Sequence, residues 1–164
     1  MKTAIAFAVA VLLSVPALAQ GTIFVVRHAE RADAGTSGAS MMATDPNLSD
    51  AGRARAEALA SMLRDAKITA IYTTEYNRTK QTAEPLAKAL GIPATVIGVR
   101  DMKGLLEKVK AGGNALVVGH SNTVGTILEA LGVSEKIALG DDEYDNLFVV
   151  VTGEKPTLVR LHFR

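Results

Sequence analysis

The stretch TIFVVRHAE, residues 22–30, joins an apolar run to an arginine and a histidine. Its four apolar residues, 23–26, include three β-branched side chains and lead directly into Arg27 and His28. A short apolar run of this kind predicts a buried strand. In a sheet flanked by helices, ligands bind at the carboxyl ends of the strands. The stretch therefore predicts that Arg27 and His28 are delivered to a functional site.

A second apolar run repeats this arrangement. Residues 115–118, ALVV, are followed by the sequence GHSN, which places His120 directly after another predicted buried strand. We expect the rest of the chain to act as the scaffold that brings His28 and His120 together. The third histidine, His162, lies in the last predicted strand and is interpreted as structural.

The order of the remaining elements predicts the fold class. Apolar runs alternate with segments of helical periodicity, which is typical of an α/β protein with a mostly parallel sheet. We expect a three-layer α/β/α fold with helices on both faces of the central sheet and an antiparallel edge formed by a final hairpin. Strands are predicted at residues 23–26, 68–72, 94–99, 115–118, 147–152 and 157–163. Helices are predicted from Ser49 to about Asp65, from Thr74 or Glu75 to about Leu90, at residues 102–110 and at residues 123–131.

The N-terminus has the pattern of a secretory signal peptide. Lys2 gives a positive start, residues 3–15 are apolar or small, and Ala17-Leu18-Ala19 is a typical cleavage site. The apolar run is shorter than the roughly 20 residues that a membrane span needs, and no Cys follows the cleavage site to carry a lipid anchor. We therefore expect residues 1–19 to be a signal peptide and residues 20–164 to be one exported domain, periplasmic or secreted.

Composition and charge narrow the class of function. The chain contains no Cys, which excludes a disulfide framework, a thiolate metal site and a cysteine nucleophile. Loss of residues 1–19 removes Lys2 and no acidic residue, so the mature chain is formally neutral. There is no basic surface pattern with interleaved aromatics that would indicate nucleic-acid binding. A cationic site in this protein must therefore be local.

Arg27, Arg78, His28 and His120 suit a phosphoryl group. Arg78 lies in the first turns of a predicted helix, just beyond a predicted strand, which is a favourable place for an anion. Arginine offers a fixed fork of donors that matches phosphate better than lysine does. An imidazole can attack phosphorus when its far nitrogen is held by a hydrogen bond. A second imidazole can stabilise the charge that develops on the phosphoryl oxygens.

Four motifs, taken in order, resemble those of the histidine phosphatase superfamily, which includes the phosphoglycerate mutases. Residues 27–30, RHAE, resemble its Arg-His-Gly-type signature, with Ala29 in place of the usual Gly. Residues 48–56, LSDAGRARA, resemble its L-S/T-x-x-G-x-x-Q-A segment. Residues 72–83, YTTEYNRTKQTA, resemble its Y-S-S…R-x-x-Q-T-A segment, and residues 118–122, VGHSN, resemble its second histidine motif. The resemblance covers most of the mature chain.

The resemblance implies both a fold and an activity. The fold would be phosphoglycerate mutase-like, and the protein would be a phosphoric monoester hydrolase that needs no metal or organic cofactor. His28 would be the phosphorylated nucleophile, and Arg27, Arg78 and His120 would complete the phosphate pocket. Asn122 is a further candidate for phosphate binding, although it could equally cap the helix that follows.

The general acid is the part of this chemistry that the pattern leaves open. The long insertion that carries it in the mutases and the larger acid phosphatases is absent. The candidates are Asp101, Glu143 and Asp33; Asp101 is also a natural helix cap, and the other two are also typical of solvated loop charges. We further expect residues 33–47 and 140–146 to shape the mouth of the pocket.

Several functions fit this pattern. The leading hypothesis is an exported phosphatase acting on a small-molecule or envelope-borne phosphorylated substrate. A phosphomutase would require a substrate-enclosing insertion, and both it and a protein phosphohistidine phosphatase would have cytoplasmic substrates. A non-catalytic phosphate- or phosphoglycan-binding protein of the cell envelope would keep the pocket without the acid. A metal hydrolase built on His28 and His120 would need a ligand spacing that matches no zinc motif.

Overall fold

A computed structural model describes residues 21–33 and 45–163 of the chain. The predicted signal peptide, residues 1–19, lies outside the described residues, as does most of the predicted loop at 33–47. The elements, in chain order, are β1 (Thr22–Arg27), α1 (Asp50–Leu63), β2 (Ile68–Thr73), α2 (Asn77–Leu90), β3 (Thr95–Val96), α3 (Met102–Lys110), β4 (Asn114–Gly119), α4 (Ser121–Ala130), β5 (Asn146–Val151) and β6 (Thr157–His162).

The strands form one six-stranded sheet in the order β3-β2-β4-β1-β5-β6. The first four strands in that order are parallel, whereas β5 is antiparallel to β1 and β6 is antiparallel to β5. The predicted mixed sheet with an antiparallel edge hairpin is therefore confirmed. The register places Arg27 opposite Gly119, so β1 and β4 end side by side at the centre of the sheet.

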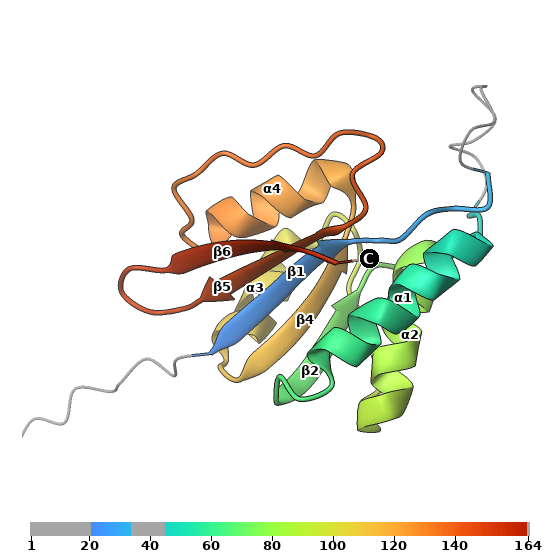
Figure 1. Cartoon of the computed structure of the whole chain (residues 1–164). Coiled ribbons are helices and arrows are strands. Elements are labelled where there is room, and N and C mark those ends of the chain that lie inside the picture. The colour runs from blue at the N-terminus through green and yellow to red at the C-terminus, as the bar shows by residue number, and fades with distance from the viewer. Residues whose placement is uncertain (1–20, 34–44, 164) are drawn as a thin grey trace, which may run out of the picture.

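Helices cover both faces of the sheet, with α1 and α2 on one side and α3 and α4 on the other (Figure 1). Alternate residues of β1 pack into two hydrophobic clusters, one on each face of the sheet. Val26 packs in the cluster with Leu59 and Leu86 of the first helix pair, and Val25 packs in the cluster with Val109 and Leu128 of the second. Burial on both faces explains why β1 and β4 are apolar throughout rather than alternating.

Most helix ends agree with the sequence prediction. Ser49 caps α1 by accepting a hydrogen bond from the Gly52 amide at 3.0 Å, and Asp101 caps α3 by accepting one from the Gly104 amide at 2.9 Å. Gly91 ends α2 in the left-handed conformation, with φ of 67°, which is the usual role of glycine at this position.

Several element bounds differ from the prediction, and three of these differences have a clear structural cause. The strand expected at 94–99 is reduced to Thr95–Val96, because this edge strand pairs with β2 alone. The second helix begins at Asn77 rather than at Thr74 or Glu75, because Tyr76 keeps an extended backbone. The fourth helix begins at Ser121, two residues early. Its cap is His120, so Ser121 and Asn122 lie inside the first turn and do not cap it.

Residues 133–145, called the strap below, connect α4 to β5. The strap runs back alongside α4 towards the carboxyl end of the sheet (Figure 1). It approaches the helix closely at Gly125, where a Cβ atom would lie 2.2 Å from the Ile137 carbonyl oxygen. A glycine at this helix position therefore allows the strap to lie against α4.

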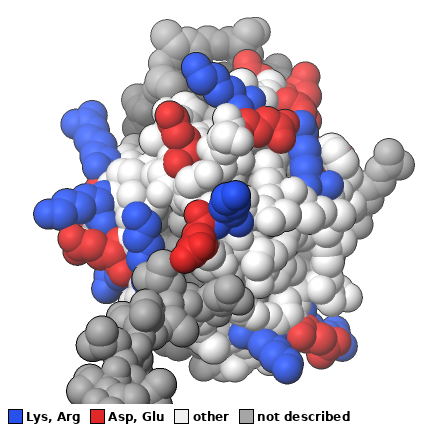
Figure 2. Space-filling view, turned by 90° about the vertical axis from the view of Figure 1, so that its left-hand side faces the viewer, with Lys and Arg blue, Asp and Glu red and all other residues white. Residues whose placement is uncertain are grey.

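The surface carries charges of both signs. On the face shown in Figure 2, lysine and arginine side chains are interspersed with acidic ones on a largely uncharged surface. Within residues 21–33 and 45–163, no helix is both long and apolar enough to cross a membrane.

Candidate active site

His28 follows β1 and is almost completely buried, with 4% of its surface exposed. Its amide donates to the Gly119 carbonyl at 3.0 Å, which extends the β1–β4 pairing by one residue. Its ring Nδ1 lies 2.8 Å from the Ala29 carbonyl oxygen. A carbonyl can only accept, so Nδ1 carries the proton and Nε2 presents its lone pair. The Ala29 amide in turn donates to Thr82 Oγ1 at 2.9 Å, which fixes the backbone that holds the ring.

Arg27, the last residue of β1, is also buried. Its Nη1 donates to the carbonyl oxygens of Gly140 and Asp141, both at 2.8 Å, so the guanidinium holds the returning strap. Its Cζ lies 4.1 Å from the centroid of the Tyr144 ring, a cation–π contact. Its Nε is buried and has no hydrogen-bond partner among the described residues.

His120, at the end of β4, is held by two threonines. Its Nε2 lies 3.0 Å from Thr74 Oγ1, which lies 2.9 Å from Thr79 Oγ1. The Thr79 hydroxyl donates its single proton to backbone carbonyl oxygens, including that of Tyr76 at 2.8 Å. Thr74 must therefore donate to Thr79 and accept from His120, which places a proton on His120 Nε2.

Arg78 enters from the first turn of α2. Its Cζ lies 4.3 Å from the centroid of the Tyr76 ring, and its Nη1 lies 3.8 Å from Asp45 Oδ1. Both Asp45 oxygens accept from the Asn77 amide, at 2.9 and 3.0 Å, at the start of the same helix. Like Arg27, Arg78 has a buried Nε without a hydrogen-bond partner in the described part of the chain.

The structure brings His28, His120 and the two arginines into one positively charged cluster. The two imidazole centroids are 5.3 Å apart. Burial, together with the neighbouring His120, Arg78 and Arg27, lowers the pKa of His28 to about 3 despite its bond to Ala29. Burial and the field of Arg78 lower the pKa of His120 to about 4. Both rings are therefore neutral at neutral pH, and Arg27 and Arg78 carry the positive charge of the cluster.

The three predicted acid candidates each have another partner. Asp101 caps α3, and Asp33 lies 3.0 Å from Arg31 Nε. Glu143 accepts from the Gly140 amide at 2.6 Å and pairs with Arg160 at 3.0 Å, which lowers the pKa of its carboxyl. Their catalytic roles stay predictions.

The other predicted site residues lie farther out. Asn122 is exposed at the start of α4 and lines a depression between that helix and the strap. Residues 34–44 of the predicted pocket mouth lie outside the described part of the chain. The segment 140–146 does reach the site, because its carbonyl oxygens bind Arg27 and its Tyr144 ring lies 6.1 Å from that of His28. His162 lies in β6, as predicted, with Nδ1 3.1 Å from Asp145 Oδ2.

Sequence reasoning did not single out Tyr76 or Tyr144, which stack on the two guanidinium groups. Tyr76 also meets His120 edge-on, with ring centroids 5.3 Å apart. The position of Tyr76, two residues before Arg78, was a local feature from which its contact with that arginine could have been predicted. No local feature of the sequence predicts the contact of Tyr144, because its position depends on the path of the strap over α4.

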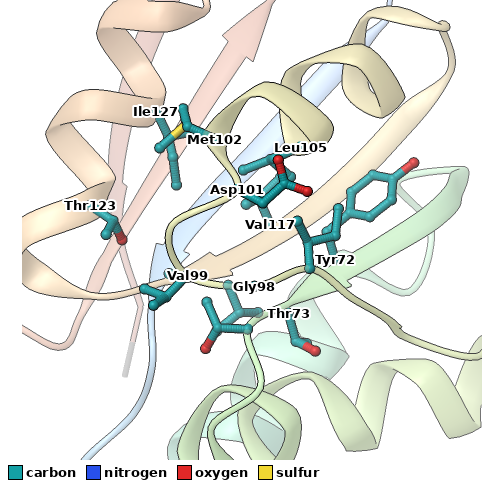
Figure 3. Close-up of a pocket in the computed structure, with 14 residues that line it drawn as sticks. Tyr72, Thr73, Gly98, Val99, Asp101, Met102, Leu105, Val117, Thr123 and Ile127 are labelled. Carbon is teal, nitrogen blue, oxygen red and sulfur yellow. The ribbon is translucent and has the colours of Figure 1, made fainter.

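Two hollows are lined by chain neighbours of the cluster residues, although none of the four cluster residues lines either hollow. The first is a mostly apolar cavity of about 30 Å³ between α3, α4 and the ends of β2 and β4 (Figure 3), which is too small for a substrate. The second is an open depression of about 630 Å³ lined by Glu75, Tyr76, Gly98, Val99, Arg100 and Asp101. Within residues 21–33 and 45–163, no group of three or more His, Asp or Glu side chains is arranged to hold a metal ion.

Several solved structures have the same fold. A putative phosphohistidine phosphatase, SixA, from Agrobacterium tumefaciens is 20% identical, with 85% of this chain and 97% of that chain covered and a TM-score of 0.62. A phosphoglycerate mutase from Bacillus anthracis is 16% identical, with 87% and 93% covered and a TM-score of 0.68. A mycobacterial glucosyl-3-phosphoglycerate phosphatase is 13% identical, with 85% and 97% covered and a TM-score of 0.64. A search of curated proteins finds no match.

The family is shown by the sequence itself. The model of the histidine phosphatase superfamily, branch 1, matches residues 23–107, which is more than half of the chain. The matched region includes three of the four motifs identified above and the residues Arg27, His28 and Arg78. The chain belongs to branch 1 of the histidine phosphatase superfamily.

Proposed function

We propose that this protein is an exported phosphatase that hydrolyses a phosphomonoester, or a related phosphate, through a phosphohistidine on His28 and without a metal cofactor. The observation that carries the proposal is the 2.8 Å bond from His28 Nδ1 to the Ala29 carbonyl. This bond leaves Nε2 as the nucleophilic atom, and the low pKa of about 3 keeps it unprotonated at neutral pH.

The surrounding groups suit the charge of the substrate. The buried Nε atoms of Arg27 and Arg78 have no hydrogen-bond partners among the described residues, so a phosphoryl oxygen can accept from them. In the first step, His28 Nε2 bonds to phosphorus, the bond from phosphorus to the leaving oxygen breaks, and that oxygen takes up a proton. In the second step, water attacks phosphorus, the P–N bond breaks, and inorganic phosphate leaves with His28 neutral again.

Turnover of an aryl phosphate by the purified protein tests this proposal. We expect turnover that resists a chelator and is lost in His28→Ala. Turnover that the chelator abolishes, or that His28→Ala retains, would contradict the proposed mechanism.

A binding protein is the second candidate. It is favoured by one observation: Asp33, Asp101 and Glu143, the acids expected from sequence, all have other partners. Such a protein would bind phosphate through Arg27 and Arg78 and would release no product from any ester. Vanadate or phosphate binding without turnover in the assay above would favour this candidate.

Export is proposed from the sequence of residues 1–19. Its support is the positive start, the apolar segment and the Ala17-Leu18-Ala19 cleavage pattern. N-terminal sequencing of the protein recovered from cells that produce the full chain should give Gln20 as the first residue. Recovery of a chain that begins at Met1 would contradict cleavage.

A further inference from the structure

Resting on the proposed phosphatase function, we propose that Glu75 is the catalytic acid that protonates the leaving group and the base that then deprotonates the attacking water. In the chain, Glu75 lies between Thr74 and Tyr76, which both contact the His120 ring. Thr74 Oγ1 is 3.0 Å from His120 Nε2, and the Tyr76 ring meets the imidazole edge-on at 5.3 Å between centroids. The backbone of Glu75 is therefore fixed at the edge of the site.

Only one of the two oxygens of the Glu75 carboxylate accepts a hydrogen bond from the described residues. Oε2 accepts a hydrogen bond from the Val99 amide at 2.8 Å. Oε1 makes no hydrogen bond to residues 21–33 or 45–163, and the exposed side chain lines the open depression together with Tyr76. The loop that supplies the Val99 amide is itself tied to the end of β2, because the Ile97 amide donates to the Thr73 carbonyl at 2.8 Å; Thr73, Gly98 and Val99 are seen in Figure 3.

The depression is a suitable place for the leaving group. It is open to solvent, is lined in part by Tyr76, whose ring contacts both Arg78 and His120, and is large enough, at about 630 Å³, for a small organic group. A phosphoryl group bound by Arg27 and Arg78 would direct its ester oxygen away from His28, because the nucleophile and the leaving group lie in line. A carboxyl at the wall of the depression can then reach that oxygen directly or through one water.

Glu75 also differs from the other carboxylates around the histidines. Glu75 and Asp45 both raise the pKa of His120, against the larger effect of burial, so both act on the site electrostatically. Both oxygens of Asp45, however, accept from the Asn77 amide. Asp101 lines the same depression and is also held by one oxygen, because its Oδ1 caps α3, but it is not among the groups that shift the pKa of His120. Glu75 combines an electrostatic effect on His120 with an oxygen that makes no hydrogen bond to the described residues.

Glu75 would give up one proton in the first step and regain one in the second. As the bond from phosphorus to the leaving oxygen breaks, the protonated Glu75 carboxyl transfers its proton to that oxygen, and the alcohol leaves. The resulting carboxylate then takes a proton from water as the water oxygen bonds to phosphorus and the P–N bond to His28 breaks. Glu75 ends protonated, as it began, and His28 is regenerated.

Glu75→Gln is the informative substitution. The amide oxygen of glutamine can still accept from the Val99 amide, so the loop stays anchored, but the side chain cannot act as an acid. An activated aryl ester such as 4-nitrophenyl phosphate needs little protonation of its leaving group, whereas an alkyl phosphate needs it fully. We expect kcat/KM on the alkyl phosphate to fall by about 100-fold or more, and on 4-nitrophenyl phosphate by less than about tenfold.

Two matched variants complete the test. Glu84→Gln removes a surface carboxylate that pairs with Lys88. It should leave kcat/KM unchanged on both the alkyl phosphate and 4-nitrophenyl phosphate. Asp101→Asn keeps the helix cap and tests the rival acid in the same depression. The inference would be overturned if Glu75→Gln lowered kcat/KM equally on both substrates or lowered it on neither. It would also be overturned if Asp101→Asn, and not Glu75→Gln, selectively lowered kcat/KM on the alkyl phosphate. If the unmodified protein turns over neither substrate, the proposed function fails and the role of Glu75 fails with it.

Discussion

The rings of His28 and His120 lie with their centroids 5.3 Å apart and their planes inclined by 64°, although 91 residues separate them in the chain. Their proximity follows from the pairing of β1 with β4, in which Arg27 is opposite Gly119 and the His28 amide bonds to the Gly119 carbonyl. The two histidines are the next residues along these parallel strands. The site is therefore a direct product of strand register.

The first prediction concerns the tautomer of His28. Because Nδ1 donates to the Ala29 carbonyl, the neutral ring should carry its proton on Nδ1 and none on Nε2. Nitrogen-15 NMR of the histidine side chains at neutral pH should show this form, with a titration midpoint near 3 rather than the ordinary 6.5. A proton on Nε2, or a midpoint near 6.5, would contradict the geometry.

The second prediction concerns stability as the pH falls. The pKa values of His28 and His120 are lowered to about 3 and about 4 in the folded protein, so between these values and about 6.5 the unfolded chain binds more protons. The free energy of unfolding should therefore be fully retained above about pH 6.5 and fall below it, by up to about 1.4 kcal/mol per pH unit for each histidine.

Chemical denaturation at pH 7 and pH 5 measures this slope. His28→Asn should reduce the dependence of the free energy of unfolding on pH by the contribution of one histidine. Asparagine does not titrate, but its side chain can still donate a hydrogen bond to the Ala29 carbonyl. An unchanged slope in this variant would show that His28 is not the source of the acid sensitivity.

Sequence predicted the centre of this molecule better than its periphery. Apolar runs buried on both faces identify β1 and β4, and the residues that follow them identify the two histidines, because burial and strand ends are local properties. The reduced β3 was missed because an edge strand pairs on one side only. Tyr144 was missed because its contact with Arg27 depends on the strap, whose path follows from tertiary packing at Gly125.

The third prediction separates the two arginines. Arg27 donates to the Gly140 and Asp141 carbonyl oxygens, whereas Arg78 forms a longer ion pair, with its Nη1 3.8 Å from Asp45 Oδ1. Arg27→Lys should therefore lower both phosphate affinity and the free energy of unfolding, the latter by about 1–3 kcal/mol. Arg78→Lys should lower phosphate affinity with a stability loss under about 1 kcal/mol.

Calorimetric titration with phosphate and thermal unfolding of both variants measure these effects. Equal stability losses in the two variants would show that Arg27 does not hold the strap in solution.

The fourth prediction tests the strap itself. In Gly125→Ala the new Cβ would meet the Ile137 carbonyl oxygen at 2.2 Å, so the strap must move away from α4. We expect a loss of about 1–3 kcal/mol in stability and reduced activity, because the displaced strap no longer supports Arg27. Gly98→Ala is the control for stability, since no atom of the described residues, its chain neighbours aside, lies within 4 Å of its Cβ position. Equal unfolding temperatures for the two variants would argue against a close strap contact.

The most direct measurement is the identification of the phosphorylated residue. The protein should be mixed with an aryl phosphate, quenched in base to preserve the P–N bond, digested and examined by mass spectrometry. We expect one phosphate on the peptide that contains His28, and none in His28→Ala. Turnover without a phosphopeptide, or phosphate on His120 instead, would show that His28 is not the nucleophile.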